Sequence, residues 1–214
     1  MKRPFLIILL VLFFDQLLKI WVKTHMIPQE SITMAGNWFF LTFVENNGMA
    51  FGMEFGGEFG KLTLSLFRVI VVGVMAYYLF KAAKNGTLHK GLVVSFSLIV
   101  AGAFGNIIDS MFYGMMFSDN YGEVAKFLPE GGGYASFLHG KVVDMFYFPI
   151  TTFHIPSWSP IYSGESFLFF SPVFNLADFA ISTGVGVFLL YQKHFFKEEK
   201  KDQPNTETIV PEEV

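Results

Sequence analysis

Four long apolar runs constrain the fold of this chain of 214 residues more than any other feature. Each run holds about 20 residues, and a helix of that length is roughly 30 Å long, which matches the hydrocarbon core of a bilayer. Charged residues make up only 15% of the sequence, against about 25% in soluble domains. The sequence therefore predicts a membrane all-α fold, a bundle of four transmembrane helices. The predicted spans cover residues 4–24, 62–81, 92–112 and 172–191.

The first run could also be a secretory signal peptide, because Lys2 and Arg3 precede it. A small-residue cleavage site does not follow, and apolar character resumes after Asp15. We therefore interpret the run as a retained span. Asp15 and Lys19 are four residues apart within it, a spacing that predicts an ion pair on one face of the helix.

The positive residues predict the orientation of the spans. Lys and Arg are concentrated at the N-terminus, in the turn at 81–90 and after the fourth run. Because such residues are enriched in cytoplasmic segments, we expect both termini in the cytoplasm and two long loops, 25–60 and 114–170, outside. The aromatic stretch 38–44 predicts a strand, and residues 139–146 are strand-like. The outer loops should therefore form a small extracytoplasmic cap that contains β structure.

The sequence predicts one domain and a tail. We expect residues 1–201 to form a single four-span domain and residues 202–214 to be a disordered cytoplasmic tail. In the third run, Gly102 and Asn106 are four residues apart, and so are Ala101 and Gly105, a small-residue pattern that lets helices approach closely. The chain contains no cysteine, which excludes disulfides and thiolate chemistry.

The polar residues inside the predicted spans converge at one depth. With the expected orientation, they lie near the outer leaflet boundary, together with two residues of the outer loops. They are Asp15, Asn106, Asp109, Asn175 and Asp178 in the spans, and Asn46 and Asp144 in the loops. A carboxylate in a bilayer costs several kcal/mol unless it is paired, hydrated or protonated, so this convergence indicates a functional site.

Asp178 has a defined place in the predicted fourth span. We expect that helix to begin at Pro172, with Ser171 as its cap. Asp178 would then lie on the order of 9 Å from the helix start, with Asn175 on the same face. The alternative, that Asp178 only hydrogen-bonds a neighbouring helix, stays open at this point.

The converging acids could form a catalytic pair. Two carboxylates that approach each other in a dry site share one proton, which provides a base to activate water and an acid to protonate a leaving nitrogen. Other hydrolytic chemistries lack their motifs, because the sequence has neither His-Glu-x-x-His nor Gly-x-Ser-x-Gly. We expect no metal and no cofactor, and we interpret His139, close to Asp144 in the sequence, as structural.

Five short blocks resemble those of the lipoprotein signal peptidase family, also called signal peptidase II, and they occur in the family's order. The blocks are Asp15-Gln16-x-x-Lys19, Asn46-x-Gly48-x-Ala50-Phe51, Gly105-Asn106-x-x-Asp109, Gly140-x-Val142-Val143-Asp144 and Phe174-Asn175-x-Ala177-Asp178. One block alone is a weak signal, but five blocks at matching topological positions are specific. The resemblance covers nearly the whole chain.

The resemblance implies a monomeric aspartic endopeptidase of the bacterial inner membrane, with its active site at the outer leaflet boundary. It would remove the signal peptide of a diacylglyceryl-modified prolipoprotein just before the lipidated cysteine. Its partners would be that substrate and membrane lipid, and not nucleic acid. Asp144 and Asp178 match the family's catalytic pair. The residues expected to line or support the site are Asp15, Lys19, Asn46, Gly48, Asn106, Asp109, Asn175 and Ala177.

Two features depart from the family pattern. The family usually has Arg after the Asp of the third block, where this chain has Ser110. If that Arg contacts a carboxylate or the substrate, another cation must replace it, and we expect Arg68 first and Lys141 second. The stretches 109–139 and 144–174 are also longer than in the family, so the shape of the outer cap is not predicted.

Two other classes of function fit a four-span protein with buried acids. One is a small transporter or proton-conducting subunit, which needs polar residues through the full depth of the bilayer. The other is a catalytically inactive scaffold or lipid-binding protein of the same fold, which Ser110 would permit. The gathering of the acids at one boundary argues against the first class. The presence of both Asp144 and Asp178 argues against the second.

Overall fold

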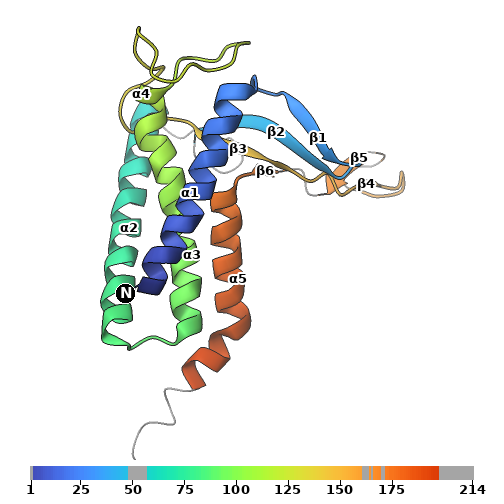
Figure 1. The fold of residues 1–214 in the computed structure, drawn as a ribbon. Coiled ribbons are helices and arrows are strands. Elements are labelled where there is room, and N and C mark those ends of the chain that lie inside the picture. Colours follow the sequence, from blue (N-terminus) through green and yellow to red (C-terminus); the bar gives the residue numbers. More distant parts are fainter. Residues whose placement is uncertain (1, 48–56, 161–163, 165, 170–171, 198–214) are drawn as a thin grey trace, which may run out of the picture.

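The computed structural model describes residues 2–47, 57–160, 164, 166–169 and 172–197. In this part of the chain, four long helices run side by side, and a sheet at one end of them projects to one side (Figure 1). The helices are α1 (Lys2–His25), α2 (Gly57–Asn85), α3 (Lys90–Ile108) and α5 (Leu176–Lys197). The start of α1, the turn between α2 and α3 and the end of α5 lie at the end opposite the sheet. The predicted tail 202–214 lies outside the described residues.

The described helices include three that are long and apolar enough to cross a membrane. These are α1, the part of α2 from Phe59 to Asn85, and α3 with its extension to Met116. The chain is therefore a multi-pass membrane protein. α5 has a similar length of 22 residues but carries Lys193 and Lys197 in its last turns. Its role as a fourth span and the orientation of the termini stay predictions.

α3 does not end as a regular helix. It continues into a π-helical turn, η2 (Asp109–Tyr113), and a short helix, α4 (Gly114–Met116). The sequence predicts the span at 92–112 but gives no sign of the change in helical geometry. Single π-helical turns are rare and are found frequently at functional sites. Here the turn begins at a buried acid, Asp109.

The contact between α3 and α5 depends on small residues. A Cβ atom added to Gly102 would lie 2.1 Å from the carbonyl oxygen of Ala177, and one added to Gly184 would lie 2.7 Å from the carbonyl oxygen of Ser95. The two backbones approach this closely because side chains are missing at these points. The close helix approach predicted from the small residues of the third apolar run is confirmed.

Among the described residues, the sheet has four strands in the order β1-β2-β3-β6, and neighbouring strands are antiparallel. They are β1 (Ser31–Ala35), β2 (Phe39–Asn46), β3 (Val142–Tyr147) and β6 (Val173–Phe174). A separate hairpin contains β4 (Thr151–His154) and β5 (Ser166–Phe169). β2 and β3 confirm the strands predicted at 38–44 and 139–146, although β3 begins only at Val142. β1 was not predicted.

A cluster of buried apolar side chains fixes the sheet to the end of α1. The cluster joins β2 and β3 to the last turns of α1, and the loop after α4 completes it. Its members include Val22, Met26, Phe43, Phe117, Ala125, Val143 and Met145. Burial of apolar area stabilises such a contact by roughly 25 cal/mol per Å². The cluster therefore holds β3, and the acid that it carries, against the helices.

The predicted start of the fourth helix is wrong. The sequence predicts a start at Pro172, but residues 173–174 form β6, which pairs with β3, and α5 begins at Leu176. Hydrogen bonds to a strand far away in the sequence hold these residues extended, and local helix signals cannot indicate that. Asp178 therefore lies in the first turn of α5 and not about 9 Å below its start. Ser171, the predicted cap, lies outside the described residues.

We expect Gly102→Ala to lower the stability of the protein by about 1–3 kcal/mol, because the added methyl group must push α5 away from α3. Thermal unfolding of the purified chain in detergent measures the effect. Gly73→Ala is the matched control, since a Cβ atom there would have no neighbour within 4 Å. Equal melting temperatures for the two variants would contradict this account of the contact.

Candidate active site

Asn175 and Asp178 cap the first turn of α5 with each other. The backbone N–H of Asp178 donates to Asn175 Oδ1 at 2.9 Å, and the backbone N–H of Asn175 donates to Asp178 Oδ2 at 3.2 Å. Such a reciprocal arrangement is a capping box. The bend from β6 into α5 thus fixes the Asp178 carboxylate at a helix N-terminus, where the helix dipole favours negative charge.

Asp144 reaches the same place from β3. It is only 4% exposed. Its Oδ1 accepts a hydrogen bond from Asn175 Nδ2 at 2.7 Å, and its Oδ2 accepts one from Asn46 of β2. Burial, and after it the negative charge of Asp178, raise the pKa of the Asp144 carboxyl to about 7. Near neutral pH, Asp144 can therefore carry a proton beside a second acid.

Two asparagine side chains join the acids. Asn106 of α3 donates through Nδ2 to Asp178 Oδ1 at 2.8 Å, and its Oδ1 accepts from Asn175 Nδ2 at 3.1 Å. The same Nδ2 of Asn175 also donates to Asp144 Oδ1, and it lies 3.2 Å from the carbonyl oxygen of Val143. A continuous path of hydrogen bonds therefore runs from Asp144 through two amides to Asp178.

Lys19 of α1 forms a buried cluster with two acids, named here the Lys19 trio (Asp15, Lys19 and Asp109). Its Nζ lies 2.9 Å from Asp15 Oδ2, 2.8 Å from Asp109 Oδ2 and 2.9 Å from Asn106 Oδ1. An ammonium group has three donors, so these acceptors fill its capacity. The predicted Asp15–Lys19 ion pair is confirmed. The trio also holds the Asn106 amide that faces Asp178.

The acids of the Lys19 trio hold two backbone segments of the site as well. Asp15 Oδ1 accepts from the N–H of Ala177, in the first turn of α5, at 2.9 Å. Asp109 Oδ2 accepts from the N–H of Val143, next to Asp144 on β3, at 3.3 Å. One buried cluster therefore positions both segments that carry the candidate catalytic acids.

Comparison with known proteins identifies the family. The family model of signal peptidase (SPase) II matches residues 7–194. The chain belongs to the signal peptidase II family. A lipoprotein signal peptidase of Porphyromonas gingivalis is 49% identical over 184 residues, which are 86% of this chain and 80% of the relative. One of Amoebophilus asiaticus is 39% identical over 186 residues, which are 86% of this chain and 75% of that relative.

Two solved structures of bacterial membrane enzymes, both obtained by the in meso method, share the fold. The first, at 2.3 Å resolution, has a TM-score of 0.59 and 23% sequence identity, and the match covers 99% of this chain and 96% of that one. The second, at 1.9 Å, has a TM-score of 0.57 and 25% identity, and the match covers 90% of this chain and 93% of that one. This chain therefore shares the arrangement of its helices and sheet with these two structures.

The blocks that resemble signal peptidase II meet in one hydrogen-bonded network. The members are Asp15, Lys19, Asn46, Asn106, Asp109, Asp144, Asn175 and Asp178, with the backbone of Ala177. Gly48 lies outside the described residues. His139 Nδ1 contacts the Ser136 hydroxyl at 3.1 Å and the Phe137 carbonyl at 3.0 Å, in line with a structural role. Within the described ranges, no group of three His, Cys, Asp or Glu side chains could hold a metal ion.

Ser110 stands where the signal peptidase II family usually has Arg. It is buried and donates to the carbonyl oxygen of Asn106 at 3.1 Å. Arg68 of α2 interacts electrostatically with Asp178, whereas Lys141 Nζ lies 3.6 Å from Glu45 Oε2. Of the two cations expected to replace the Arg, Arg68 is therefore the one that interacts with a candidate catalytic acid.

Gln16 supports the network, although it was noted in the sequence only as part of the first block and not as a site residue. Its Nε2 donates to Asp109 Oδ1 at 2.9 Å and to the carbonyl oxygen of Gly105 at 3.3 Å. Its Oε1 accepts from the Tyr113 hydroxyl at 3.1 Å. The side chain thus links α1 to both α3 and η2. An amide next to a buried acid, inside an apolar run, is the signal that could have indicated it.

A second buried cation, Lys23, lies one helical turn beyond Lys19. It is fully buried, forms an ion pair with Glu45 of β2 and lies 4.9 Å from the ring centroid of Tyr134 and 5.3 Å from that of Phe117. Both rings stabilise the cation and come from the long outer insertion. Lys23 therefore attaches this insertion to α1. Its four-residue spacing from Lys19 is the signal that could have indicated a second inward-facing cation.

We expect Lys19→Met to destabilise the protein by about 3–5 kcal/mol, because the two acids of the Lys19 trio would stay buried without their cation. The melting temperature of the purified protein in detergent measures this loss. Lys84→Met, at the exposed end of α2, is the control and should leave the melting temperature unchanged. A Lys19→Met protein as stable as the original chain would show that the trio is not needed for folding.

Proposed function

We propose that this member of the signal peptidase II family is an intramembrane aspartic endopeptidase. Its substrate would be a diacylglyceryl-modified prolipoprotein, cleaved just before the lipidated cysteine. The observation that carries the proposal is the hydrogen-bonded path that joins the carboxyl groups of Asp144 and Asp178. These are the two acids that match the family's catalytic pair, and they come from a strand and a helix far apart in the sequence.

The proposed reaction divides the work between the two acids. Asp178 takes a proton from a water molecule, whose oxygen attacks the carbonyl carbon of the scissile peptide bond, and Asp144 donates its proton to the carbonyl oxygen. In the second step Asp144 takes back a hydroxyl proton, Asp178 gives its proton to the peptide nitrogen, and the C–N bond breaks. Assignment of Asp144 as the initial acid rests on its raised pKa.

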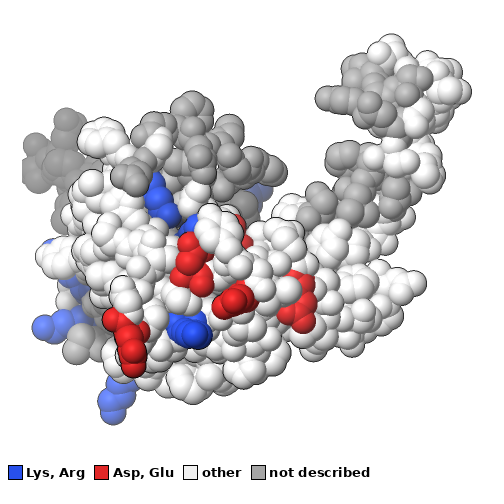
Figure 2. Space-filling model, turned by 90° about the horizontal axis from the view of Figure 1, so that it is seen from above, with Lys and Arg blue, Asp and Glu red and all other residues white. Residues whose placement is uncertain are grey.

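The surface of the cap supports a position of the site at the outer leaflet boundary. Figure 2 shows the molecule from the sheet end of the bundle. The described Lys, Arg, Asp and Glu side chains gather over the helices. None is visible on the part of the cap that projects to one side, named here the arm (Figure 2). Exposed apolar side chains on this arm include Met34, Trp38, Ile150, Phe153 and Trp158. Aromatic residues favour the membrane interface. We therefore propose that the arm lies at a membrane surface. Together with the positive residues at the opposite end of the bundle, this supports the outer surface for the arm, the cytoplasm for the termini and α5 as the fourth span.

The direct test is cleavage of a synthetic prolipoprotein by the purified chain reconstituted in lipid. We expect the signal peptide to be released from the diacylglyceryl-modified substrate, and the same peptide without the lipid to be cleaved poorly. Absence of cleavage under both conditions would favour a catalytically inactive scaffold. A proton conductance of the reconstituted vesicles without peptide release would favour the transport alternative.

We expect Asp144→Asn and Asp178→Asn each to abolish cleavage, a loss on the order of 10²–10⁴-fold or more. Asn keeps the size of the side chain but can neither take up nor release the proton. The rate of signal peptide release measures the loss, and the melting temperature reports folding. Asp119→Asn, in the exposed part of the insertion, is the matched control and should keep full activity. Substantial activity of purified Asp144→Asn or Asp178→Asn protein would show that these two acids are not the catalytic pair.

The raised pKa of Asp144 predicts how the rate depends on pH. Below about pH 7 the Asp144 carboxyl holds the proton that the first step needs, and above about pH 7 it loses that proton. The value of kcat/KM should therefore fall as the pH rises through this range. Initial rates with the lipidated substrate, measured between about pH 5 and about pH 9, check the expectation. A rate that keeps rising above neutral pH would assign the acid step to another group.

A further inference from the structure

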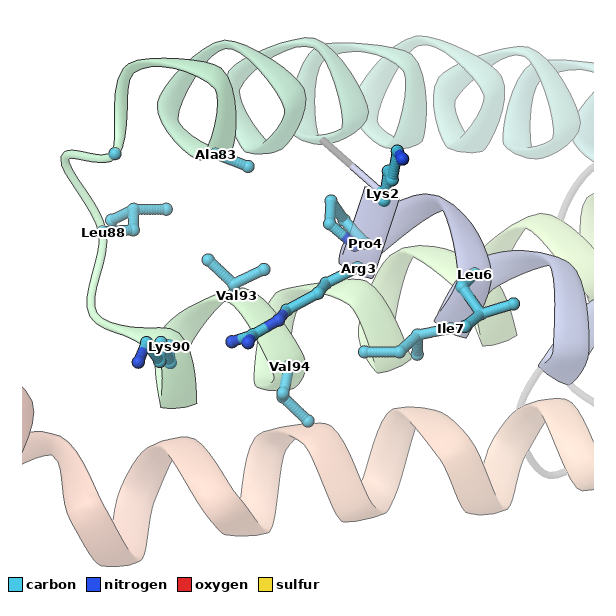
Figure 3. A pocket seen from close by; sticks show the side chains of 11 residues that line it. Lys2, Arg3, Pro4, Leu6, Ile7, Ala83, Leu88, Lys90, Val93 and Val94 are labelled. Atoms are coloured by element: carbon cyan, nitrogen blue, oxygen red, sulfur yellow. The ribbon is translucent and has the colours of Figure 1, made fainter.

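A pocket lies at the end of the bundle opposite the candidate active site (Figure 3). The start of α1, the end of α2 and the start of α3 enclose it. Its volume is about 620 Å³, within the roughly 300–1,000 Å³ that is typical of ligand sites. Nothing in the proposed peptidase reaction uses this pocket.

Three cations border the pocket. They are Lys2 and Arg3 of α1 and Lys90 of α3, and none of the described lining residues is Asp or Glu. Among the described residues, none of the three cations takes part in an ion pair. Figure 3 shows Arg3 extended from α1 toward the Lys90 end of α3, while Lys2 points toward α2. Positive groups around one pocket, with no acid among its described lining residues, favour a bound anion.

The wall of the pocket is apolar. Ile7, Val93 and Val94 contribute to it, and the wall continues onto the outside of the bundle. There, Leu6 is 54% exposed and Val94 is 39% exposed. Because the pocket lies at the ends of helices that cross the membrane, this outer surface faces lipid chains. A small soluble anion would leave the apolar wall uncovered, whereas a lipid with an anionic head group would cover both parts.

We propose that this pocket binds an anionic phospholipid. The phosphate would lie among Lys2, Arg3 and Lys90, and one acyl chain would lie against Leu6 and Val94. Basic pockets between transmembrane helices bind anionic head groups in this way. The site would fill from the cytoplasmic leaflet in the orientation proposed above, but the argument from charge and shape holds for either orientation and does not require peptidase activity.

Binding can be measured on the purified full-length chain in detergent. We expect phosphatidylglycerol to bind, as seen by native mass spectrometry, and to raise the melting temperature, whereas zwitterionic phosphatidylcholine should do neither. Replacement of the three cations together (Lys2→Ala, Arg3→Ala and Lys90→Ala) should lower the affinity for phosphatidylglycerol on the order of 100-fold, about fivefold for each cation.

The matched control removes three other cations from the same end of the molecule. Lys81→Ala, Lys84→Ala and Lys193→Ala together change the net charge by the same amount, and none of these exposed residues lines the pocket. This variant should bind phosphatidylglycerol nearly as the original chain does. An equal loss of affinity in both triple variants would overturn the proposal, because binding would then depend on net charge alone.

A third variant tests the shape of the pocket without a change of charge. Ala83→Phe places a ring in the cavity from α2 and should reduce binding of phosphatidylglycerol. Unchanged affinity of the folded Ala83→Phe protein would overturn the proposal. Inorganic phosphate that raises the melting temperature as much as phosphatidylglycerol would overturn it too, since the lipid chain would then contribute nothing. If Ala83→Phe does not fold, the comparison of the two triple variants decides.

Discussion

Lys19 lies inside a bundle of apolar helices, where an ammonium group is strongly unfavourable unless every one of its donors has a partner. Asp15, Asp109 and Asn106 supply those partners. The same acids also accept from the backbone at the start of α5 and from the backbone of β3. The helices, the sheet and the candidate catalytic pair must therefore be in place together. The contacts that stabilise the fold are therefore the same contacts that set the geometry of the site.

The sequence predicts the bundle well because hydropathy depends on composition over many residues. It predicts element ends poorly where a distant segment decides them. Ser171 and Pro172 are signals for the start of a helix, but residues 173–174 pair as β6 with β3 and are extended. The π-helical turn at Asp109 likewise occurs in a run that looks uniformly helical. The strand β1 was missed because it depends on pairing with β2.

The sequence predicts which residues belong to the candidate site, but it does not predict the hydrogen bonds between them. An acid or an amide in an apolar run is conspicuous, so Asp15, Asn106 and Asp178 could be found one by one. The bridge made by Asn175 could not be found, since it depends on where β3 brings Asp144. The ring contacts of Lys23 depend on an insertion for which the family pattern offers no guide.

The reciprocal cap of Asn175 and Asp178 gives the Asp178 carboxyl group two tasks. Asp178 Oδ2 holds the first backbone N–H at the start of α5, and in the proposed reaction the same carboxyl group receives a proton from water. A protonated carboxyl group is a weaker acceptor than a carboxylate. Each catalytic cycle would therefore loosen the beginning of α5 while Asp178 holds the proton and tighten it again when the proton leaves.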